Sequence, residues 1–202
     1  MLKSAVGVAH EQAVFKRRVQ VLSDHMVAYL PNSGIVLDVG TGDGTIASRW
    51  TRARPGISVE GIDLMVRKRT AIPVRKFNGL DIPYPDKSVD VVTFVDVLHH
   101  ADSISTLLSE ARRVARRSVV IKDHLAENWF DHATLRFMDW VGNAPHGVVL
   151  PYNYKSFGEW GGYFREAALS IVAFDKAIPL YPPPFSLLFG RNLHFIAELK
   201  PL

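Results

Sequence analysis

The sequence predicts an α/β protein built on a doubly wound, mostly parallel β-sheet with helices on both faces. The first observation is that short apolar segments alternate with segments of helical periodicity over about residues 1–125, an order typical of parallel sheets with right-handed crossovers. The second is the segment Val89 to Val95, which is nearly all apolar and β-branched, as expected for a central strand covered on both faces. The third is a glycine-rich turn directly after the first strand-like segment.

The elements of this sheet follow one another in a regular order. Apolar residues at helical spacing predict a first helix over residues 11–30, which ends at Pro31-Asn32-Ser33-Gly34. Apolar segments between turn residues predict strands over residues 35–39, 58–64, 74–77, 89–95 and 118–122. Helical spacing predicts further helices over residues 45–54, 67–71 and 103–114.

The last third of the chain continues with two helices and two strands. Helical spacing covers residues 129–141 and 157–168, and strand-like segments cover residues 170–174 and 193–199. We expect these strands to pair antiparallel at one edge of the sheet, as a hairpin around the Pro182-Pro183-Pro184 loop. Because no linker or repeat interrupts the chain, we expect one domain over residues 1–202, with a core up to about 125, a helical insertion over about 125–168 and terminal strands over 169–202.

Composition excludes several classes of protein. Hydrophobic residues make up 48% and charged residues 22% of the chain, which is typical of a globular protein and excludes global disorder. Cysteine is absent, which excludes a disulfide scaffold, a cysteine-ligated zinc site and a cysteine nucleophile. No apolar run reaches the length of a membrane span, and residues 1–10 lack the pattern of a signal peptide. We therefore expect a cytoplasmic protein without a membrane span.

Charge and aromatic residues are unevenly distributed. Up to Asp123 the chain holds 18 Lys and Arg against 13 Asp and Glu, and beyond it 6 against 7, so the overall charge of +4 arises in the first part. Of the 21 aromatic residues, 15 lie after Asp123. We interpret the basic clusters at Arg67-Lys68-Arg69 and Arg112-Arg113 as solvated surfaces and expect no nucleic-acid partner.

The glycine-rich turn carries the first chemical signal. Gly40, Gly42 and Gly44 follow Asp38 at the end of the first predicted strand and open a helix. Glycines let the backbone turn tightly and approach a ligand, and the amides at a helix N-terminus face that ligand. The spacing is G-x-G-x-G and Thr45 follows, so the G-x-G-x-x-G pattern of nicotinamide and flavin binders is not met.

Further polar residues follow the later strands at their carboxyl ends, where open α/β sheets bind ligands. Asp63 ends the second predicted strand, and a carboxylate at that place can accept hydrogen bonds from both ribose hydroxyls of a nucleoside. Asn78-Gly79 follows the third strand, and the segment Asp96 to His100 follows the fourth. The sequence therefore predicts that a ligand containing a nucleoside binds at this edge of the sheet.

These motifs occur in an order that points to one family. They are Leu37-Asp38-Val39-Gly40-Thr41-Gly42-Asp43-Gly44, Asp63, Ile82-Pro83-Tyr84-Pro85-Asp86 and Val97-Leu98-His99-His100, followed by Glu110-Ala111-Arg112-Arg113-Val114. The set resembles the class I S-adenosylmethionine-dependent methyltransferases, and within them the type 11 branch that includes quinone-biosynthesis methyltransferases. The resemblance implies a Rossmann-like fold, S-adenosyl-L-methionine as cofactor, and methylation of oxygen, nitrogen or carbon in a small aromatic or apolar molecule.

The resemblance also implies roles for individual residues. Asp63 would bind the ribose diol, Asp38 the methionine amino group, and Met65 the adenine face. Asn78 stands where the family often has Asp facing the adenine amino group. The residues that the resemblance implies for cofactor binding are Asp38, Gly40, Thr41, Gly42, Gly44, Asp63, Leu64, Asn78, Gly79, Asp96 and His99.

In this family the segment after the fifth strand helps to form the substrate pocket. The residues that we expect to line this pocket are His146, Tyr152, Tyr154 and Trp160, whereas we expect Phe137, Phe164 and Phe174 in the core. A base removes a proton from many methyl acceptors, and our candidates for this role are His124, Asp123 and His100. His124 is the first choice, because histidine can titrate near neutral pH.

The sequence leaves other functions open. One is a non-catalytic S-adenosylmethionine-binding regulatory protein, another is an RNA methyltransferase, and a more distant one is a nicotinamide oxidoreductase. No Asp-Pro-Pro-Tyr-type motif follows the fourth strand, which argues against adenine-N6 or glutamine methylation, and the absent cysteine argues against cytosine-C5 methylation. The residues for metal-dependent catechol methylation are not found together, so we expect no metal site. The sequence assigns neither the acceptor atom nor the oligomeric state.

Overall fold

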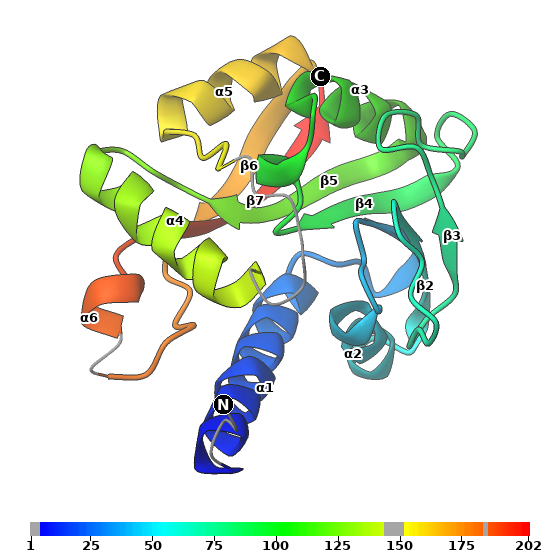
Figure 1. The fold of residues 1–202 in the computed structure, drawn as a ribbon. Helices are drawn as coiled ribbons and strands as arrows, with labels where there is room; N and C mark the ends of the chain where they lie inside the picture. The colour runs from blue at the N-terminus through cyan, green and yellow to red at the C-terminus, as the bar shows by residue number, and fades with distance from the viewer. Residues whose placement is uncertain (1–4, 144–151, 184–185) are drawn as a thin grey trace.

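The computed structural model describes residues 5–143, 152–183 and 186–202, and Figure 1 shows one sheet with helices packed around it. The sheet has seven strands in the order β3-β2-β1-β4-β5-β7-β6. Strands β1 to β5 are parallel, and β7 pairs antiparallel with both β5 and β6. The strands are β1 Ser33–Val39, β2 Gly56–Asp63, β3 Val74–Lys76, β4 Val89–Val95, β5 Ala115–His124, β6 Leu169–Asp175 and β7 His194–Pro201.

Six α-helices and one 3₁₀ turn are described between and around these strands. They are α1 Ala5–Val27, α2 Thr45–Ala53, η1 Leu98–His100, α3 Ile104–Val114, α4 Trp129–Asn143, α5 Phe157–Glu166 and α6 Ser186–Phe189. Local capping explains where two of them begin. Ser103 accepts a hydrogen bond from the Thr106 backbone amide at the start of α3, and Ser156 and Glu159 form a reciprocal capping box at the start of α5.

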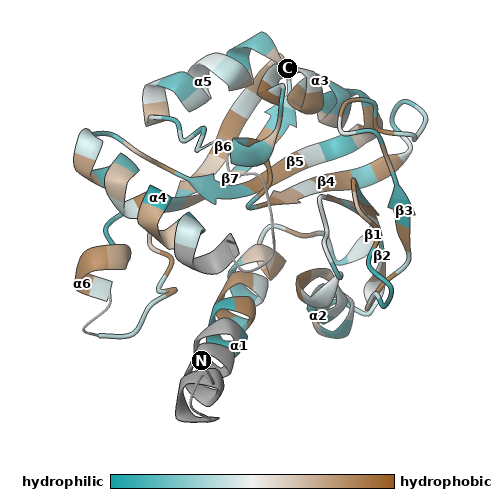
Figure 2. Cartoon of the chain, viewed as in Figure 1, coloured by the Kyte–Doolittle hydropathy of each residue, from teal (hydrophilic) through white to brown (hydrophobic). Residues whose placement is uncertain are grey.

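The sheet separates two hydrophobic cores. On one face, Leu107 of α3 and Trp160 and Phe164 of α5 pack against the strands. On the other face, Met26 of α1 and Trp50 of α2 are buried. Figure 1 shows α3 and α5 on one side of the sheet and α1 and α2 on the other, and Figure 2 shows hydrophobic residues gathered along the strands. The predicted doubly wound, mostly parallel fold with an antiparallel edge is confirmed.

The strand order reverses between β1 and β4, which lie side by side although β2 and β3 separate them in the chain. At such a switch point the connections leave in opposite directions, so a crevice opens at the carboxyl ends of the two strands. The glycine-rich turn after β1 and the η1 turn after β4 both lie at this edge.

Most predicted elements are confirmed, with three corrections. Residues 67–71 form bends and coil rather than a helix, because five residues supply too few hydrogen bonds to offset helix nucleation. Strand β5 is longer than predicted, since pairing with β4 and β7 extends it on both sides of its apolar centre. The short helix α6 and the turn η1 were not predicted. In the part of the chain that the structure describes, no helix has the length and apolar character needed to cross a membrane.

Candidate active site

The turn between β1 and α2 adopts a backbone that requires glycine. Gly40, Gly42 and Gly44 have φ angles of 74°, 62° and 74°, in the left-handed region that other residues rarely adopt. A Cβ atom at Gly40 would lie 2.4 Å from Cγ2 of Val97, so the turn packs closely against the segment after β4. A Cβ atom at Gly42 would meet no atom within 4 Å. The turn is therefore anchored at Gly40 and open to a ligand at Gly42.

Asp38 lies next to this turn and is almost completely buried. Its Oδ1 accepts a hydrogen bond of 2.6 Å from the Thr93 hydroxyl. Burial raises the pKa of Asp38 to about 6, although the Thr93 hydrogen bond acts in the opposite direction. Among the ion pairs of the described residues, none includes Asp38. A cationic group that reached Asp38 would find an uncompensated carboxylate.

Asp63 at the end of β2 connects the glycine turn to the next loop. Its Oδ2 accepts the backbone N–H of Gly42 at 2.8 Å, and its Oδ1 accepts that of Met65 at 2.9 Å. Each carboxylate oxygen has a second lone pair that can accept a hydroxyl. Leu64 and Met65 beside it are 59% and 61% exposed, so they present apolar surface to any flat group held next to Asp63.

Thr41, Asn78 and Gly79 complete the predicted cofactor residues of this region. Thr41 packs on Gly61 of β2. The Asn78 side chain belongs to its own turn, because its Oδ1 accepts the amides of Leu80 and Asp81 and its Nδ2 donates to the Asp81 carboxylate. Gly79 follows with a φ angle of 87°. An adenine contact by Asn78 stays a prediction, and it would compete with these local hydrogen bonds.

Asp96 at the end of β4 is held by two cations. Arg18 of α1 pairs with its Oδ2 at 2.8 Å, and the buried ammonium of Lys122 on β5 contacts its Oδ1. Although burial acts in the opposite direction, Lys122 and Arg18 hold the pKa of Asp96 well below its usual range. Asp96 therefore fastens α1 and β5 to the edge of the sheet, in addition to any contact with a cofactor.

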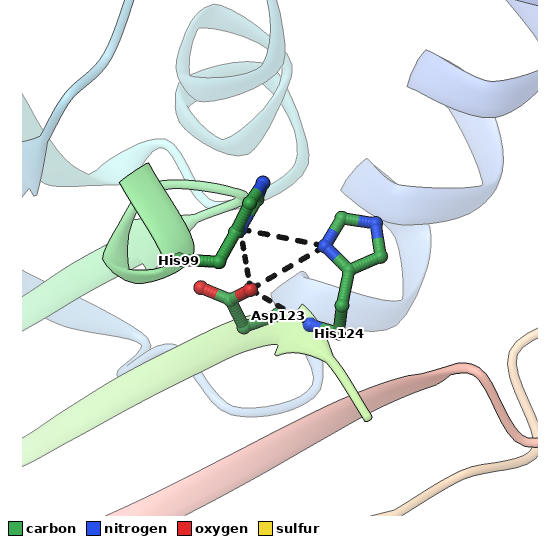
Figure 3. Close-up of side chains that lie close together, drawn as sticks. All are labelled: His99, Asp123 and His124. Atoms are coloured by element: carbon green, nitrogen blue, oxygen red, sulfur yellow. Dashed lines mark hydrogen bonds and ion pairs between the residues drawn. The ribbon is translucent and has the colours of Figure 1, made fainter. Parts of the chain in front are cut away.

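A buried cluster of His99, Asp123 and His124 lies where β4 and β5 end, as Figure 3 shows. Nδ1 of His99 lies 2.6 Å from Oδ1 of Asp123, and since a carboxylate only accepts, this nitrogen carries the proton. Asp123 also accepts the backbone amides of Leu98 at 3.0 Å and His124 at 2.7 Å. Despite complete burial, His99 keeps the pKa of Asp123 low, and Asp123 in turn raises the pKa of His99.

His124 and His100 have different environments from His99. Burial, with Lys122 and His99 nearby, lowers the pKa of His124 to about 4. The expectation that His124 titrates near neutral pH is therefore wrong, because the strand end is dry and already holds a lysine cation. Burial and His99 also lower the pKa of His100.

The predicted substrate residues fall into different places. Tyr154 is buried, its ring lies 5.7 Å from that of His99, and its hydroxyl donates to the carboxylate of Asp139 on α4. Tyr152 is partly exposed, with the Arg136 guanidinium 4.6 Å from its ring centre. His146 lies outside the described residues.

The assignments of buried and exposed aromatic residues need two corrections. Trp160 is completely buried in the core under α5, and its indole N–H donates to the His124 carbonyl, so the expectation that it lines a pocket is wrong. Phe137 of α4 is 53% exposed rather than buried, and its ring lies beside that of Trp140, which is also exposed. Phe164 is buried as expected, and Phe174 packs against the same core.

Four residues of this region were missed in the sequence. Arg18 and Lys122 neutralise Asp96, Asp139 faces His99 at 3.8 Å, and His194 of β7 accepts a contact of 3.3 Å from Lys122. A lysine inside the apolar β5 segment is an unusual pattern that could have identified Lys122. The other three come from elements that only the folded chain brings to β4 and β5.

Comparisons with known proteins agree with this geometry. A family model described as a methyltransferase domain matches residues 9–173. The demethylmenaquinone methyltransferase of Tropheryma whipplei (strain Twist) is 42% identical over 91 residues, which are 40% of this chain and 37% of the relative. The ubiquinone/menaquinone biosynthesis C-methyltransferase UbiE of Desulfotalea psychrophila is 33% identical over 95 residues, 43% of this chain and 39% of the relative. The chain thus matches less than half the length of these curated relatives.

A solved structure shows the same fold over most of the chain. It is a SAM-dependent methyltransferase from Aquifex aeolicus, with a TM-score of 0.62, 17% identity and a match that covers 89% of each chain. Because the identity is low, the match supports the arrangement of strands and helices, while the sequence matches support the family.

Proposed function

The chain belongs to the methyltransferase-domain family, and from this premise we propose that it is an S-adenosylmethionine-dependent methyltransferase that acts on a small, planar, largely apolar molecule. The observation that carries the proposal is the pairing of an open left-handed glycine turn with two acidic residues at the switch point of the sheet. Asp38 and Asp63 lie at the ends of the paired parallel strands β1 and β2, on either side of this turn, and Asp63 accepts the backbone amide of Gly42. The names of the curated relatives support the same class of reaction.

The residues of the switch point suit this cofactor. The methionine end carries an ammonium group, and Asp38 is a buried carboxylate without a cationic partner among the described ion pairs. The ribose end carries two hydroxyls, and Asp63 has two oxygens with lone pairs to spare. Leu64 and Met65 would cover one face of the adenine, and the open side of Gly42 leaves room for the methionine chain.

The side chains at the ends of β4 and β5 would receive the methyl acceptor. When bound, S-adenosylmethionine supplies a methyl group that is activated by a positively charged sulfur. The chain's own contribution is to hold the acceptor in line and to exclude water, and such positioning accounts for much of the rate of a displacement. The ring centres of His99 and His100 lie 3.9 Å apart there, and that of Tyr154 lies 5.7 Å from His99. These rings would offer aromatic contacts to a flat acceptor.

Calorimetric titration with S-adenosylmethionine and S-adenosylhomocysteine tests this proposal. We expect both ligands to bind, and Asp63→Asn to weaken binding by about tenfold to a hundredfold, since it replaces a charged acceptor of hydrogen bonds. Asp24→Asn is the matched control, because Asp24 is exposed on α1 and bonds only to Gln20 among the described contacts.

The outcome that contradicts the proposal is equally direct. A ligand that binds only the folded chain must stabilise it, by about 2.7 kcal/mol at a hundred times its dissociation constant. A folded protein that shows neither heat of binding nor a thermal shift with either ligand would rule out the cofactor assignment.

A further inference from the structure

Two imidazole nitrogens near the end of β4 are buried without a hydrogen-bond partner among the described residues. They are Nε2 of His99 and Nδ1 of His100. The His99 side chain is only 1% exposed, so bulk solvent does not reach this nitrogen. Buried polar atoms are nearly always satisfied, and an unsatisfied pair on adjacent residues points to a ligand that the two nitrogens share. Their ring centres are 3.9 Å apart in the short turn η1.

The carboxylate of Asp139 faces the same place from α4. Its Oδ2 lies 3.8 Å from Nε2 of His99, too far for a hydrogen bond. One nitrogen from each imidazole and one Asp139 oxygen lie within 4.8 Å of one another. Donor atoms bound at about 2.1 Å to one tetrahedral ion are about 3.4 Å apart, so side-chain movements of up to about 1.4 Å would bring all three into one coordination shell.

The surroundings orient these donors as a metal site requires. Asp123 accepts the Nδ1 proton of His99 at 2.6 Å, so the neutral form of this imidazole, which a metal ion would bind, has its lone pair on Nε2. The Tyr154 hydroxyl donates to the Asp139 carboxylate and so holds it toward the histidines. A histidine held by a carboxylate on its far nitrogen is the usual arrangement behind a protein-bound zinc ion.

We propose that His99, His100 and Asp139 bind one divalent transition-metal ion of the zinc type. Two imidazoles and one carboxylate are a donor set for zinc and ferrous iron, and three protein ligands leave a coordination position for a small molecule. This differs from the sequence-based expectation of no metal site. Asp139 carries no motif, and it comes near His99 because α4 packs, through Leu135, on Ala126 after β5 and on Tyr154.

A second set of donors in the same cluster is less suited to the ion. His99, Asp123 and His124 also lie close together, as Figure 3 shows. Here, however, the His99 nitrogen that faces the set is bonded to Asp123, whose two oxygens already accept three hydrogen bonds. An ion would displace these bonds, whereas the Asp139 set offers nitrogens that have none.

The position of this site suggests its use, which rests on the proposed function. Val97 packs against Gly40 of the glycine turn, and the two histidines follow it within three residues. An ion here would lower the pKa of an acceptor hydroxyl beside it, and the proton would pass to water. The acceptor oxygen would then form a bond to the methyl carbon while the carbon–sulfur bond breaks and its electron pair stays on sulfur. The acceptor class is therefore a hydroxyl, such as a phenol.

Zinc binding to the metal-free, full-length chain without a histidine tag tests the site. We expect one Zn²⁺ per chain by calorimetry, and an absorption band in the visible range when Co²⁺ replaces it. His100→Gln and Asp139→Asn should each weaken zinc binding by more than about 100-fold. Asp123→Asn removes the negative charge that faces Nδ1 of His99 and should weaken it by about 10- to 100-fold. His132→Gln is the control. It also removes a histidine, one on α4 whose ring lies near that of Tyr154, but His132 belongs to neither donor set.

Circular dichroism shows whether each variant is folded, and only folded variants are compared. Absence of stoichiometric zinc binding in the parent chain overturns the proposal, as does unchanged affinity in both His100→Gln and Asp139→Asn. If His124→Gln abolishes binding while Asp139→Asn retains it, the ion occupies the other donor set and our assignment is wrong. Binding of S-adenosylhomocysteine by the same preparations distinguishes failure of the metal site from failure of the proposed function.

Discussion

The carboxylate of Asp38 is buried and has no cation beside it among the described residues. Its ionisation therefore lowers the stability of the folded chain. Its pKa in the folded chain, about 6, is above the value of about 3.9 for an unfolded chain. The protonated form is therefore favoured by folding. Protonated Asp38 therefore adds to the free energy of unfolding below about pH 4. This contribution, about 3 kcal/mol in total, is lost as the pH rises through 6.

We predict that Asp38→Asn is more stable than the parent chain at pH 7.5 in the absence of ligand. The gain should be up to about 3 kcal/mol, because the amide has no charge to bury and still accepts the Thr93 hydroxyl. The gain should shrink as the pH falls from 6 to 4. Urea unfolding of both proteins at several pH values measures this, and a difference that does not vary with pH would contradict it. The same variant should lose affinity for S-adenosylmethionine, whose ammonium group needs the charge.

Lys122 gives a second prediction at the scale of the residue. It is completely buried, and its ammonium is matched by Asp96. We predict that Lys122→Met destabilises the chain by about 3 kcal/mol, because the partly buried Asp96 carboxylate loses one of its two cationic partners and keeps Arg18. Lys200→Met on the exposed side of β7 is the control and should change stability by less than about 0.5 kcal/mol. The free energy of unfolding in urea is the measurement, and equal values for the two variants would refute this account.

A site residue could be identified from the sequence where it lies at the end of a strand that is itself recognisable from the same short segment. Asp38, Asp63 and the glycines after Val39 are of this kind. Trp160 could not be placed, since its partner is a backbone carbonyl 36 residues earlier in the chain. Asp96 and Arg18 are 78 residues apart, and nothing in either segment indicates that they meet.

At the scale of elements, α5 begins with a complete local signal, a capping box. Ser156 accepts the Glu159 amide and Glu159 accepts the Ser156 amide, so two of the free donors at the helix start are satisfied. The same helix buries Trp160, whose indole holds the His124 carbonyl. The side chain of Trp160 therefore links α5 to the end of β5, in addition to the backbone hydrogen bond from Ala126 to the carbonyl of Lys155.

We predict that Ser156→Ala lowers the free energy of unfolding by about 1 kcal/mol, because it removes the cap of α5. Ser186→Ala is a useful control, since Ser186 begins only the four-residue helix α6. Thermal unfolding monitored by circular dichroism reports the difference. A loss at Ser186 as large as that at Ser156 would show that the capping box contributes nothing specific.

Elements were predictable from the sequence in proportion to their hydrophobic periodicity. Strand β4 was predicted with the bounds that the structure shows, because five of its seven residues are apolar. Residues 67–71 have no such pattern, and their proposed helix does not form. The 3₁₀ turn η1 has only three residues, so no periodicity exists to be recognised.

At the scale of the whole molecule, both cores share one sheet. The core under α3 and α5 and the core under α1 and α2 are formed by opposite faces of the same strands. We predict a single cooperative unfolding transition, with the same midpoint by circular dichroism and by tryptophan fluorescence. Two separated midpoints would contradict the single domain that we expect over residues 1–202, and would show that the C-terminal part unfolds independently.

The topology as a whole was predictable because each parallel strand is followed by a segment that can cover the sheet. The crossover rule then leaves few possible arrangements. The meeting of α4 with η1 was not predictable, since it depends on how a helix after the last parallel strand packs over the sheet edge. The donor set of His99, His100 and Asp139 depends on this packing.

Strand β7 follows β6 in the chain but lies between β5 and β6 in the sheet. During synthesis on a ribosome, β5 therefore emerges with one edge unpaired, and β6 has no described strand to join until β7 has been made. An unpaired edge of this kind is a site at which nascent chains associate with one another. Folding of this chain should consequently be most vulnerable to aggregation in the interval between translation of β5 and translation of β7, when a chaperone that covers exposed strand edges would help most.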